Sequence, residues 1–302
     1  MTLEEAPETN APAAPTSGML TPNTATKEHW TPQTGTAPSH PSTPTHPQTR
    51  PQPPTKKKKL TTLPVLRTLP HPPPTDPQPT TPIPFFHLLS RLKTTKREGW
   101  RRFGLNHGES IADHMYRMSI ITLLCPPALA ARLDIARCTR MALVHDMAEA
   151  LVGDITPMDN VAKSEKSRRE AETMDLLTKE LLGRVGGGKA GEEMLKVWWE
   201  YELDETEEAH FVHDVDKMEL LLQMVEYERE AQGRLDLGEF SRVAARVVLP
   251  EVKGWAEEVL REREEFWREK GVEASWMGDV EGGKRELQDQ YYGGKKENGE
   301  TK

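Results

Sequence analysis

The chain has 302 residues, a formal net charge of −8 and 25 prolines. Length alone suggests about two domains, but 21 of the prolines lie in residues 1–84. Proline interrupts helices and central strands. This stretch is also poor in large apolar side chains, so it cannot bury enough surface to offset the entropy lost on ordering. We therefore expect a disordered arm over residues 1–83, followed by one globular domain that is long enough to form a core.

Charge divides the chain at the same place. Residues 1–85 hold 7 Lys and Arg against 5 Asp and Glu, whereas the remainder holds 33 against 43. The globular part is therefore acidic, and an acidic domain binds the phosphate backbone of DNA or RNA poorly. We expect no nucleic acid polymer as a partner, although a small phosphorylated substrate remains compatible with this charge.

Other features of the composition bear on location. The sequence holds no run of about 18 apolar residues, the length that a membrane-spanning helix needs, so we expect no contact with the membrane. Glu4, Glu5 and Glu8 argue against a secretory or mitochondrial leader, and two cysteines are too few for a disulfide framework. We expect a cytoplasmic protein, and the basic run at 56–59 leaves nuclear import open as an alternative.

The first predicted elements of the globular part are helices. Apolar residues recur at near-helical spacing over residues 84–96, which predicts a first helix. Residues 99–108 are glycine-bounded and predict a loop. A second helix opens at residues 109–110 and ends before the proline pair at 126–127. Residues 128–134 predict a short helix or turn.

The second half of the domain also reads as helical. The strongest pattern covers residues 136–152, and Gly153 is a natural stop for that helix. A loop (154–160), a charged helix (163–183), a glycine break (186–188) and three further helices (190–203, 205–231 and 252–270) are expected after it. Nothing alternates with period two, so we predict an all-α domain over residues 84–275. Residues 276–302 are rich in Gly, Lys and Glu and predict a disordered tail.

Four residues of metal-ligating type lie on these predicted helices: His114, His145, Asp146 and Asp216. Imidazole nitrogens and carboxylate oxygens together suit a divalent ion of borderline or hard character, and the lack of thiolates argues against a structural zinc site. His145 and Asp146 lie in an otherwise apolar stretch, where a buried carboxylate is costly unless it is compensated. Either this pair is exposed or a cation lies beside it.

The order His114, His145–Asp146, Asp216 resembles the H…HD…D signature of the HD-domain metal-dependent phosphohydrolases. The surrounding residues resemble one branch of that family, the HD-domain 5'-deoxynucleotidases. The stretches that carry this closer resemblance are residues 109–118, 142–149, 153–157, 163–170 and 199–202. The resemblance covers about residues 84–235. It implies an HD-domain helical bundle and a homodimer.

The resemblance also implies a catalytic site. Its divalent ion, with Mn, Co, Mg and Zn all compatible, would be held by the four residues His114, His145, Asp146 and Asp216. Glu149 and Asp154 match carboxylates that the family needs for catalysis. Glu149 could orient or deprotonate the attacking water, and Asp154 could hold the sugar or aid the leaving oxygen. An alternative is that Glu149, Asp154 and the carbonyl of Ile155 bind a second, hard cation.

Residues before the first ligand are candidates for binding the substrate. The family places a tryptophan near the deoxyribose, and Trp100 matches it; a bulky ring there could exclude a 2'-hydroxyl. A nearby arginine would bind the phosphate through its forked guanidinium. Arg97 and Arg102 are the candidates, and Arg101 is also available. His213 is expected to lie outside the set of metal ligands.

These observations predict a metal-dependent phosphatase that converts deoxyribonucleoside 5'-monophosphates to deoxyribonucleosides and phosphate. One alternative is an HD phosphohydrolase that acts on another nucleotide, such as a triphosphate or a cyclic diester. Hydrolysis of a triphosphate usually needs more basic residues around the pocket, and we expect this acidic domain to offer few there. Another alternative is a non-catalytic, metal-binding scaffold that recruits partners through its arm. The intact set of ligands and carboxylates argues against the scaffold.

Overall fold

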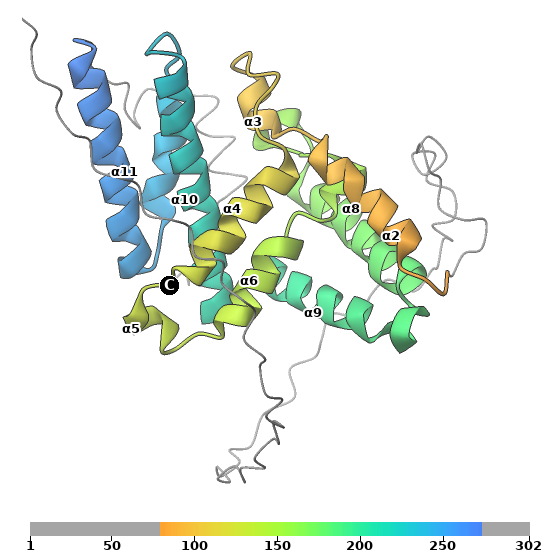
Figure 1. Cartoon of the computed structure of the whole chain (residues 1–302). Coiled ribbons are helices and arrows are strands. Elements are labelled where there is room, and N and C mark those ends of the chain that lie inside the picture. Colours follow the sequence, from red (N-terminus) through yellow and green to blue (C-terminus); the bar gives the residue numbers. More distant parts are fainter. Residues whose placement is uncertain (1–78, 274–302) are drawn as a thin grey trace, which may run out of the picture. The chain divides into compact units, whose positions relative to one another are not determined.

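Residues 79–273, which a computed structural model of the chain describes, form helices joined by short turns (Figure 1). Within this range no strand occurs, and a single isolated antiparallel bridge joins Lys96 to Ser110. The prediction of an all-α domain is confirmed for these residues. The predicted tail (276–302) lies outside the described residues, as does the predicted arm up to residue 78.

The first helix is shorter than the predicted 84–96. α2 (Ile83–Leu89) passes into a 3₁₀-helix, η1 (Ser90–Lys93), after which the chain is extended. Of the five apolar residues that gave the pattern, Phe85, Leu88 and Leu92 are buried, Leu89 is partly buried and Phe86 is exposed. The pattern therefore identified most of the buried face, and the predicted end of the helix was wrong.

Pairing with a distant segment explains where the first helix ends. Arg97 donates its backbone N–H to the carbonyl of Glu109 (3.2 Å), and Ile111 donates to the carbonyl of Thr95 (3.0 Å). These bonds hold the backbone extended at a point where the local pattern favoured helix. The short helix α3 (Glu98–Arg101) then forms where we had expected a loop.

Three helices make up the centre of the domain: α4 (Ile111–Leu123), α6 (Ile135–Val144) and α10 (Glu207–Glu230). α4 packs on α6, and α10 packs against both. α4 begins with a capping box, in which the Ser110 hydroxyl accepts from the N–H of Asp113 and the Asp113 carboxylate accepts from the N–H of Ser110. These caps fix the start of the helix that carries the first predicted ligand.

The predicted helix over 136–152 is interrupted in the structure, and that prediction was wrong. α6 ends just before His145, and the next residues form tight turns. Trp198 donates its indole N–H to the carbonyl of His145 (3.1 Å), the group that Glu149 would bond in an α-helix. The N–H of Glu149 donates instead to the carbonyl of Asp146 (3.0 Å).

The short helix α7 (Glu149–Val152) follows this turn, and Gly153 ends it with φ of 75°. Residues three apart eclipse one another when the chain is wound this tightly. Asp146 and Glu149 accordingly line the same cavity. Asp146 and Glu149 therefore face the same way, as a continuous helix would have placed them, although the helix is interrupted. The 3₁₀-helix η2 (Pro157–Asp159) closes the connection.

The remaining elements of the right-hand part of Figure 1 are α8 (Lys163–Asp175), the π-helical η3 (Leu176–Leu181), η4 (Val185–Gly188) and α9 (Lys189–Leu203). The predicted glycine break lies in η4, where Gly186 and Gly187 have positive φ. Gly191 lets α9 pack closely on η3, since a Cβ there would lie 2.3 Å from the carbonyl oxygen of Thr178.

One pocket-forming element had no counterpart among the predicted elements. The 3₁₀-helix η5 (Gly238–Arg246) lies between α10 and α11 (Pro250–Glu269) and packs against both. Its start is anchored by Glu228, a fully buried residue of α10, which accepts from the N–H of Leu237 (2.7 Å). Arg263 of α11 binds the same carboxylate (2.9 Å). A buried polar cluster therefore holds η5 in place.

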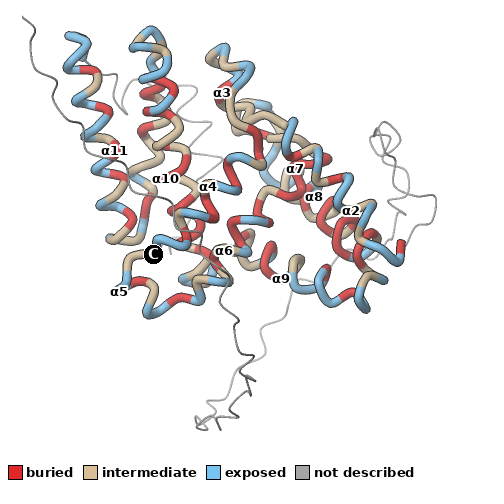
Figure 2. The backbone as a smooth tube through the Cα atoms, viewed as in Figure 1, coloured by how far each residue is buried: buried red, intermediate tan, exposed pale blue. Residues whose placement is uncertain are grey.

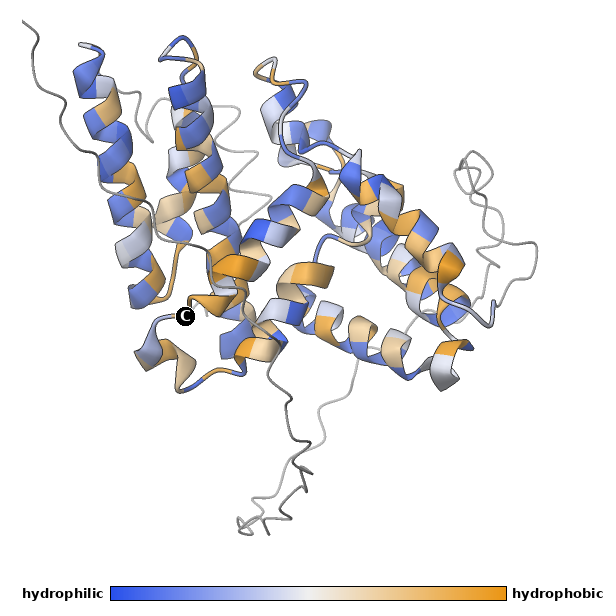
Figure 3. Ribbon diagram, viewed as in Figure 1, coloured by the Kyte–Doolittle hydropathy of each residue, from blue (hydrophilic) through white to orange (hydrophobic). Residues whose placement is uncertain are grey.

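Burial is concentrated on the surfaces where the helices meet. Figure 2 shows buried residues along the inner sides of α4, α6 and α10, and Figure 3 shows hydrophilic residues dominating the outer turns of α8, α10 and α11. α5 (Pro127–Ala130) forms the short helix expected after the proline pair. None of the helices within residues 79–273 combines the length and the apolar character that crossing a bilayer requires.

Candidate metal centre and active site

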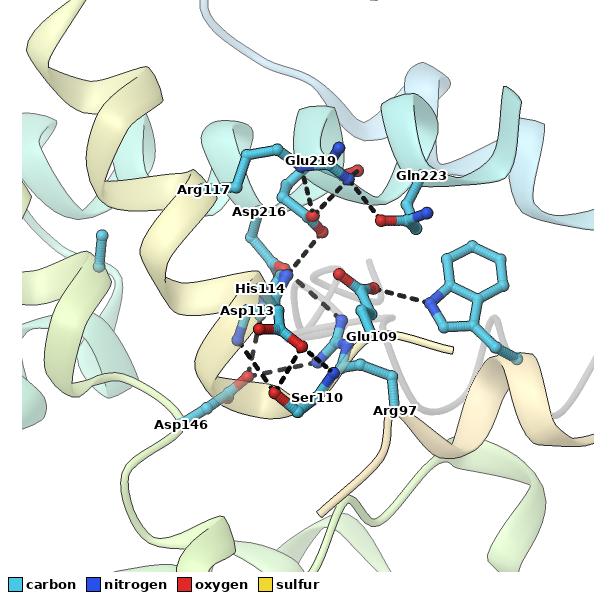
Figure 4. Close-up of polar contacts among 12 residues, drawn as sticks. Arg97, Glu109, Ser110, Asp113, His114, Arg117, Asp146, Asp216, Glu219 and Gln223 are labelled. Atoms are coloured by element: carbon cyan, nitrogen blue, oxygen red, sulfur yellow. Dashed lines mark hydrogen bonds and ion pairs between the residues drawn. The ribbon is translucent and has the colours of Figure 1, made fainter. Parts of the chain in front are cut away.

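The four predicted ligands come from three elements; His114, His145 and Asp146 lie together, and Asp216 lies beside His114. His114 is on α4, His145 and Asp146 are in the turn after α6, and Asp216 is on α10. His114 Nε2 lies 3.2 Å from Asp216 Oδ1 and 3.7 Å from Asp146 Oδ2. His145 Nε2 lies 3.1 Å from the same oxygen of Asp146. Figure 4 shows three of these side chains pointing toward one another.

Unpartnered polar atoms test whether these residues fit a metal ion. The Nε2 atoms of both histidines and Oε2 of Glu149 are buried and have no hydrogen-bond partner. Ligand atoms of His114, His145 and Asp146 lie within 4.8 Å of one another. Leaving buried polar atoms unpaired is costly. A divalent cation would satisfy the imidazole lone pairs and the carboxylate together, so the residues present fit one.

The charges around both carboxylates at this point favour their ionised form. Burial alone would raise the pKa of Asp146 and of Asp216, but the two histidines and Arg97 hold the pKa of each carboxyl well below its usual range. Ionised carboxylates are the form that binds a metal. The site is therefore electrostatically prepared for a cation.

Packing and hydrogen bonds fix the ring of His145. Its Nδ1 lies 3.0 Å from the carbonyl of Ala142, and its ring lies against Tyr201, with the ring centroids 4.9 Å apart. The bond from Trp198 to the His145 carbonyl holds the backbone as well. Occupying Nδ1 in this way leaves Nε2 directed at the site.

Arg97 is the arginine that reaches the ligands. Its guanidinium lies 3.3 Å from Asp146 and 3.9 Å from Asp216, and its side chain is 16% exposed. Burial lowers the pKa of Arg97, but the surrounding carboxylates raise it well above its ordinary value. Arg102 lies further out, where it contacts the Thr156 hydroxyl. Arg101 pairs with Glu98 and does not line the cavity.

The two predicted catalytic carboxylates lie on one wall of the site. Glu149 is 2% exposed, and burial raises its pKa well above the ordinary value, an effect that Asp146 and Asp154 increase. Asp154 is held by the N–H of Glu98 at the start of α3 (2.7 Å). Ile155 lines the same wall. These residues can therefore act on one substrate or on one further cation.

A cavity of about 350 Å³ opens beside these groups. Trp100 forms part of its wall and is 3% exposed. The indole N–H donates to Glu109 (2.7 Å), and the ring packs on Tyr227 and Phe240, with centroids 5.4 and 4.6 Å away. Its position is thus fixed on three sides.

Comparisons with known proteins identify the family. The family profile described as HD domain matches residues 89–275, more than half of the chain. The 5'-deoxynucleotidase hdd1 of Schizosaccharomyces pombe is 48% identical over 186 residues, which cover 61% of this chain and 91% of that protein. The chain belongs to the HD-domain 5'-deoxynucleotidase family.

More distant relatives share the name. The 5'-deoxynucleotidase HDDC2 of Mus musculus is 39% identical to this HD-domain protein over 181 residues, covering 59% of this chain and 86% of that one. The solved structure of HD domain-containing protein YGK1, from Saccharomyces cerevisiae, aligns with 33% identity and a TM-score of 0.48, covering 62% of this chain and 87% of that chain. Membership of the HD-domain family implies a divalent metal ion.

Several residues of the HD-domain cavity were absent from the sequence-based site. They come from α8, α9, α10 and η5: Lys163, Lys166, Ser167, Glu170, Tyr201, Glu202, His213, Lys217, Leu220, Glu239, Phe240, Arg242, Val243 and Arg246. Those of η5 carried one usable signal, the spacing of Phe240 and Val243, which is the three-residue period of a 3₁₀-helix. His213 stacks on Tyr201, with the ring centroids 3.9 Å apart.

Proposed function

We propose that this protein hydrolyses deoxyribonucleoside 5'-monophosphates to deoxyribonucleosides and phosphate. The observation that carries the proposal is one cavity beside the group His114, His145 and Asp146, with Asp216 next to His114. The cavity is lined by arginine side chains and by a buried carboxylate with an unpartnered oxygen. The relatives reported above carry the name 5'-deoxynucleotidase, which supports this class of substrate.

Each group has a role that follows from its chemistry. A divalent ion held by the four ligands would supply Lewis acidity toward a phosphate oxygen. Arg97 would bind the phosphate through its fork of N–H donors, since its guanidinium already lies beside the ligand carboxylates. Glu149 would accept a proton from the attacking water at Oε2, the atom that has no hydrogen-bond partner.

Two further residues are proposed to face the nucleoside. Asp154 is held in place by the start of α3 and is proposed to contact the sugar or the leaving oxygen. Trp100 is immobilised by its neighbours and is proposed to leave no room for a 2'-hydroxyl. Arg102, at the rim, is a second candidate for contact with the phosphate. Alternatively, Glu149, Asp154 and the Ile155 carbonyl would together bind a second cation.

The identity of the metal belongs to the proposal as well. A site of two imidazoles and two carboxylates accepts Mn²⁺, Co²⁺, Mg²⁺ or Zn²⁺, and availability selects among them. We therefore propose one divalent ion per chain without assigning the element, and a second ion only in the alternative just given.

We also propose that the protein is a homodimer. Exposed large apolar side chains occur on α4 and α9 and on α6, which packs against both, and at Leu124 directly after α4: Tyr116, Ile120, Leu123, Leu124, Leu143, Trp199 and Leu203. In Figure 3 hydrophobic residues reach the outer turns of α4 and α6. Exposed apolar patches of this kind mark interaction surfaces, and a second copy of the chain would cover this one.

The substrate is tested by phosphate release from a panel of nucleotides. The panel contains deoxyribonucleoside and ribonucleoside monophosphates, a deoxynucleoside triphosphate and a cyclic dinucleotide, each with Mn²⁺, Co²⁺ or Mg²⁺. We expect release from the deoxyribonucleoside monophosphates by the wild type and none by Asp146→Ala. Turnover of the triphosphate or cyclic substrate alone would favour another HD phosphohydrolase activity. No turnover of any substrate would favour the scaffold.

A further inference from the structure

His114 has a second partner on the side of its ring away from the predicted metal. Its Nδ1 lies 2.6 Å from Oε2 of Glu219, and the Glu219 side chain is fully buried (Figure 4). Glu219 does not line the cavity. It can therefore influence the reaction only through the residues that it contacts.

Arg117 holds Glu219 in place. The Arg117 guanidinium donates from Nε to Oε1 of Glu219 (2.8 Å), and it also binds Gln223 (2.9 Å) and the exposed Glu226 (2.6 Å). Oε1 of Glu219 therefore accepts from Arg117, while Oε2 is the oxygen that faces His114.

The spacing of these residues links two helices. On α4, Arg117 lies three residues after His114, and on α10, Glu219 lies three residues after Asp216. Residues three apart share a helix face. One turn of α4 therefore supplies the predicted ligand His114 together with Arg117, and one turn of α10 supplies the predicted ligand Asp216 together with Glu219.

We infer that Glu219 is a positioning residue for the metal centre. A neutral imidazole has one N–H and one lone pair, and a carboxylate at 2.6 Å from Nδ1 requires the N–H there. In the neutral ring, which is the form that binds a metal, the lone pair is then on Nε2, the atom that faces Asp146 and Asp216. Glu219 thus selects the tautomer and the ring orientation that bind a cation. This role rests on the metal centre of the proposed function but not on its substrate.

The same atoms suggest a competing arrangement. Ligand atoms of Glu109, His114 and Glu219 also lie within 4.8 Å of one another and could in principle hold an ion. However, Glu219 already accepts from Arg117, and Glu109 already accepts from the Trp100 indole (2.7 Å). The two carboxylates on this side of His114 therefore each accept from a donor, whereas on the other side the Nε2 atoms of His114 and His145 and Oε2 of Glu149 have no hydrogen-bond partner.

The test measures metal binding by the full chain without substrate. Apo protein competes with a chromogenic chelator for Zn²⁺, as wild type, Glu219→Gln and Glu226→Gln. Glutamine keeps the shape of Glu219 but removes its charge, and we expect the affinity to fall about 10- to 100-fold, as for other carboxylate partners of metal-bound histidines. Glu226→Gln is the matched control, because it loses a contact with Arg117 without touching His114, and it should bind as the wild type does.

Nitrogen-15 NMR of the histidine rings in the Zn²⁺-loaded wild-type protein gives an independent readout. It does not depend on whether a variant folds. We expect His114 to carry its proton on Nδ1 and the metal on Nε2. Metal on Nδ1, unchanged affinity in Glu219→Gln, or an equal loss in both variants would overturn the inference. Two ions per wild-type chain, one of them lost in Glu219→Gln, would overturn it in favour of the competing arrangement. Wild type that binds Zn²⁺ but releases no phosphate would refute the proposed function alone.

Discussion

Glu149 is the side chain on which the proposed chemistry most depends, because one of its oxygens is buried without a partner beside the ligand cluster. We expect Glu149→Gln to lower kcat by about 10²- to 10⁴-fold, with metal affinity close to that of the wild type. Steady-state phosphate release and chelator competition measure the two quantities.

A carboxylate elsewhere on the same side of the domain serves as the control for that variant. Glu165 of α8 pairs with Arg168 on the surface and does not line the cavity. Glu165→Gln should keep the wild-type kcat. Near-normal turnover by Glu149→Gln would remove this residue from the mechanism.

Glu170 of α8 gives a prediction about pH and stability. Burial raises its pKa from the ordinary value of 4.5 to about 7, and Lys166, 3.3 Å away, only partly offsets this. The folded protein then holds a proton that the unfolded chain releases, so stability declines as pH rises from 4.5 to 7 and stays lower above that. Glu170→Gln lacks this decline and should gain up to about 3 kcal/mol relative to wild type between pH 5 and pH 8.

Denaturant unfolding of the metal-free protein at the two pH values measures this effect. Removing the metal matters because a nearby cation would itself favour the ionised carboxylate. Parallel pH dependence in wild type and variant would mean that Glu170 is ionised in the folded protein at neutral pH.

The resemblance of the sequence to the HD-domain family was what named His114, His145 and Asp146 together, and the structure places these three side chains close to one another. The sequence was not sufficient to choose among three neighbouring arginines. Arg97 reaches Asp146 only because its backbone is held extended by bonds to Glu109. Glu219 was missed because nothing in the neighbouring sequence distinguishes it from the other acidic residues of α10. Its role comes from a histidine 105 positions away.

At the scale of elements, the buried cluster between α10 and α11 carries the clearest consequence. Arg263 is 1% exposed and binds Glu228 (2.9 Å) and Asp236 (2.8 Å). Arg263→Met would leave Glu228 as a buried charge with a weakened set of partners, so we expect a loss of about 3–5 kcal/mol in the free energy of unfolding. Since Glu228 also anchors the start of η5, KM should rise.

An exposed ion pair between the same two helices provides the comparison. Arg229 lies 3.1 Å from Glu262, and both side chains are about half exposed. Arg229→Ala should cost no more than about 1 kcal/mol and leave KM unchanged. Equal costs for the two variants, measured by denaturant unfolding, would show that the buried cluster is not a special anchor.

Helix boundaries were predictable where the signal is local. Proline, glycine and the capping residues mark the ends of α4, α9 and α11 within a few residues of the expected positions. The break at His145 could not be predicted from local sequence. It depends on Trp198, 53 positions away, which donates a hydrogen bond to the His145 carbonyl that a continuous helix would use. η5 escaped prediction because two large apolar residues alone, Phe240 and Val243, carry its three-residue period.

At the scale of the whole molecule, the exposed apolar face of α4, α6 and α9 predicts association. Light scattering after gel filtration should give a dimer for the wild type and a monomer for Leu123→Glu combined with Leu203→Glu, because two charges would have to be buried in the interface. Val248→Glu alters an equally exposed apolar residue outside that face and should stay dimeric. A monomeric wild type would contradict the proposed dimer.

The central claim is that one divalent ion, held by His114, His145, Asp146 and Asp216, is required for hydrolysis of the monophosphate. Metal-free protein is titrated with Mn²⁺ or Co²⁺ while bound ions per chain and phosphate released from a deoxyribonucleoside monophosphate are measured together. We expect release to be absent without metal and to reach its maximum at one ion per chain. Asp146→Asn should neither bind the ion tightly nor release phosphate. Full phosphate release by the metal-free protein, or by Asp146→Asn at the wild-type rate, would contradict the account.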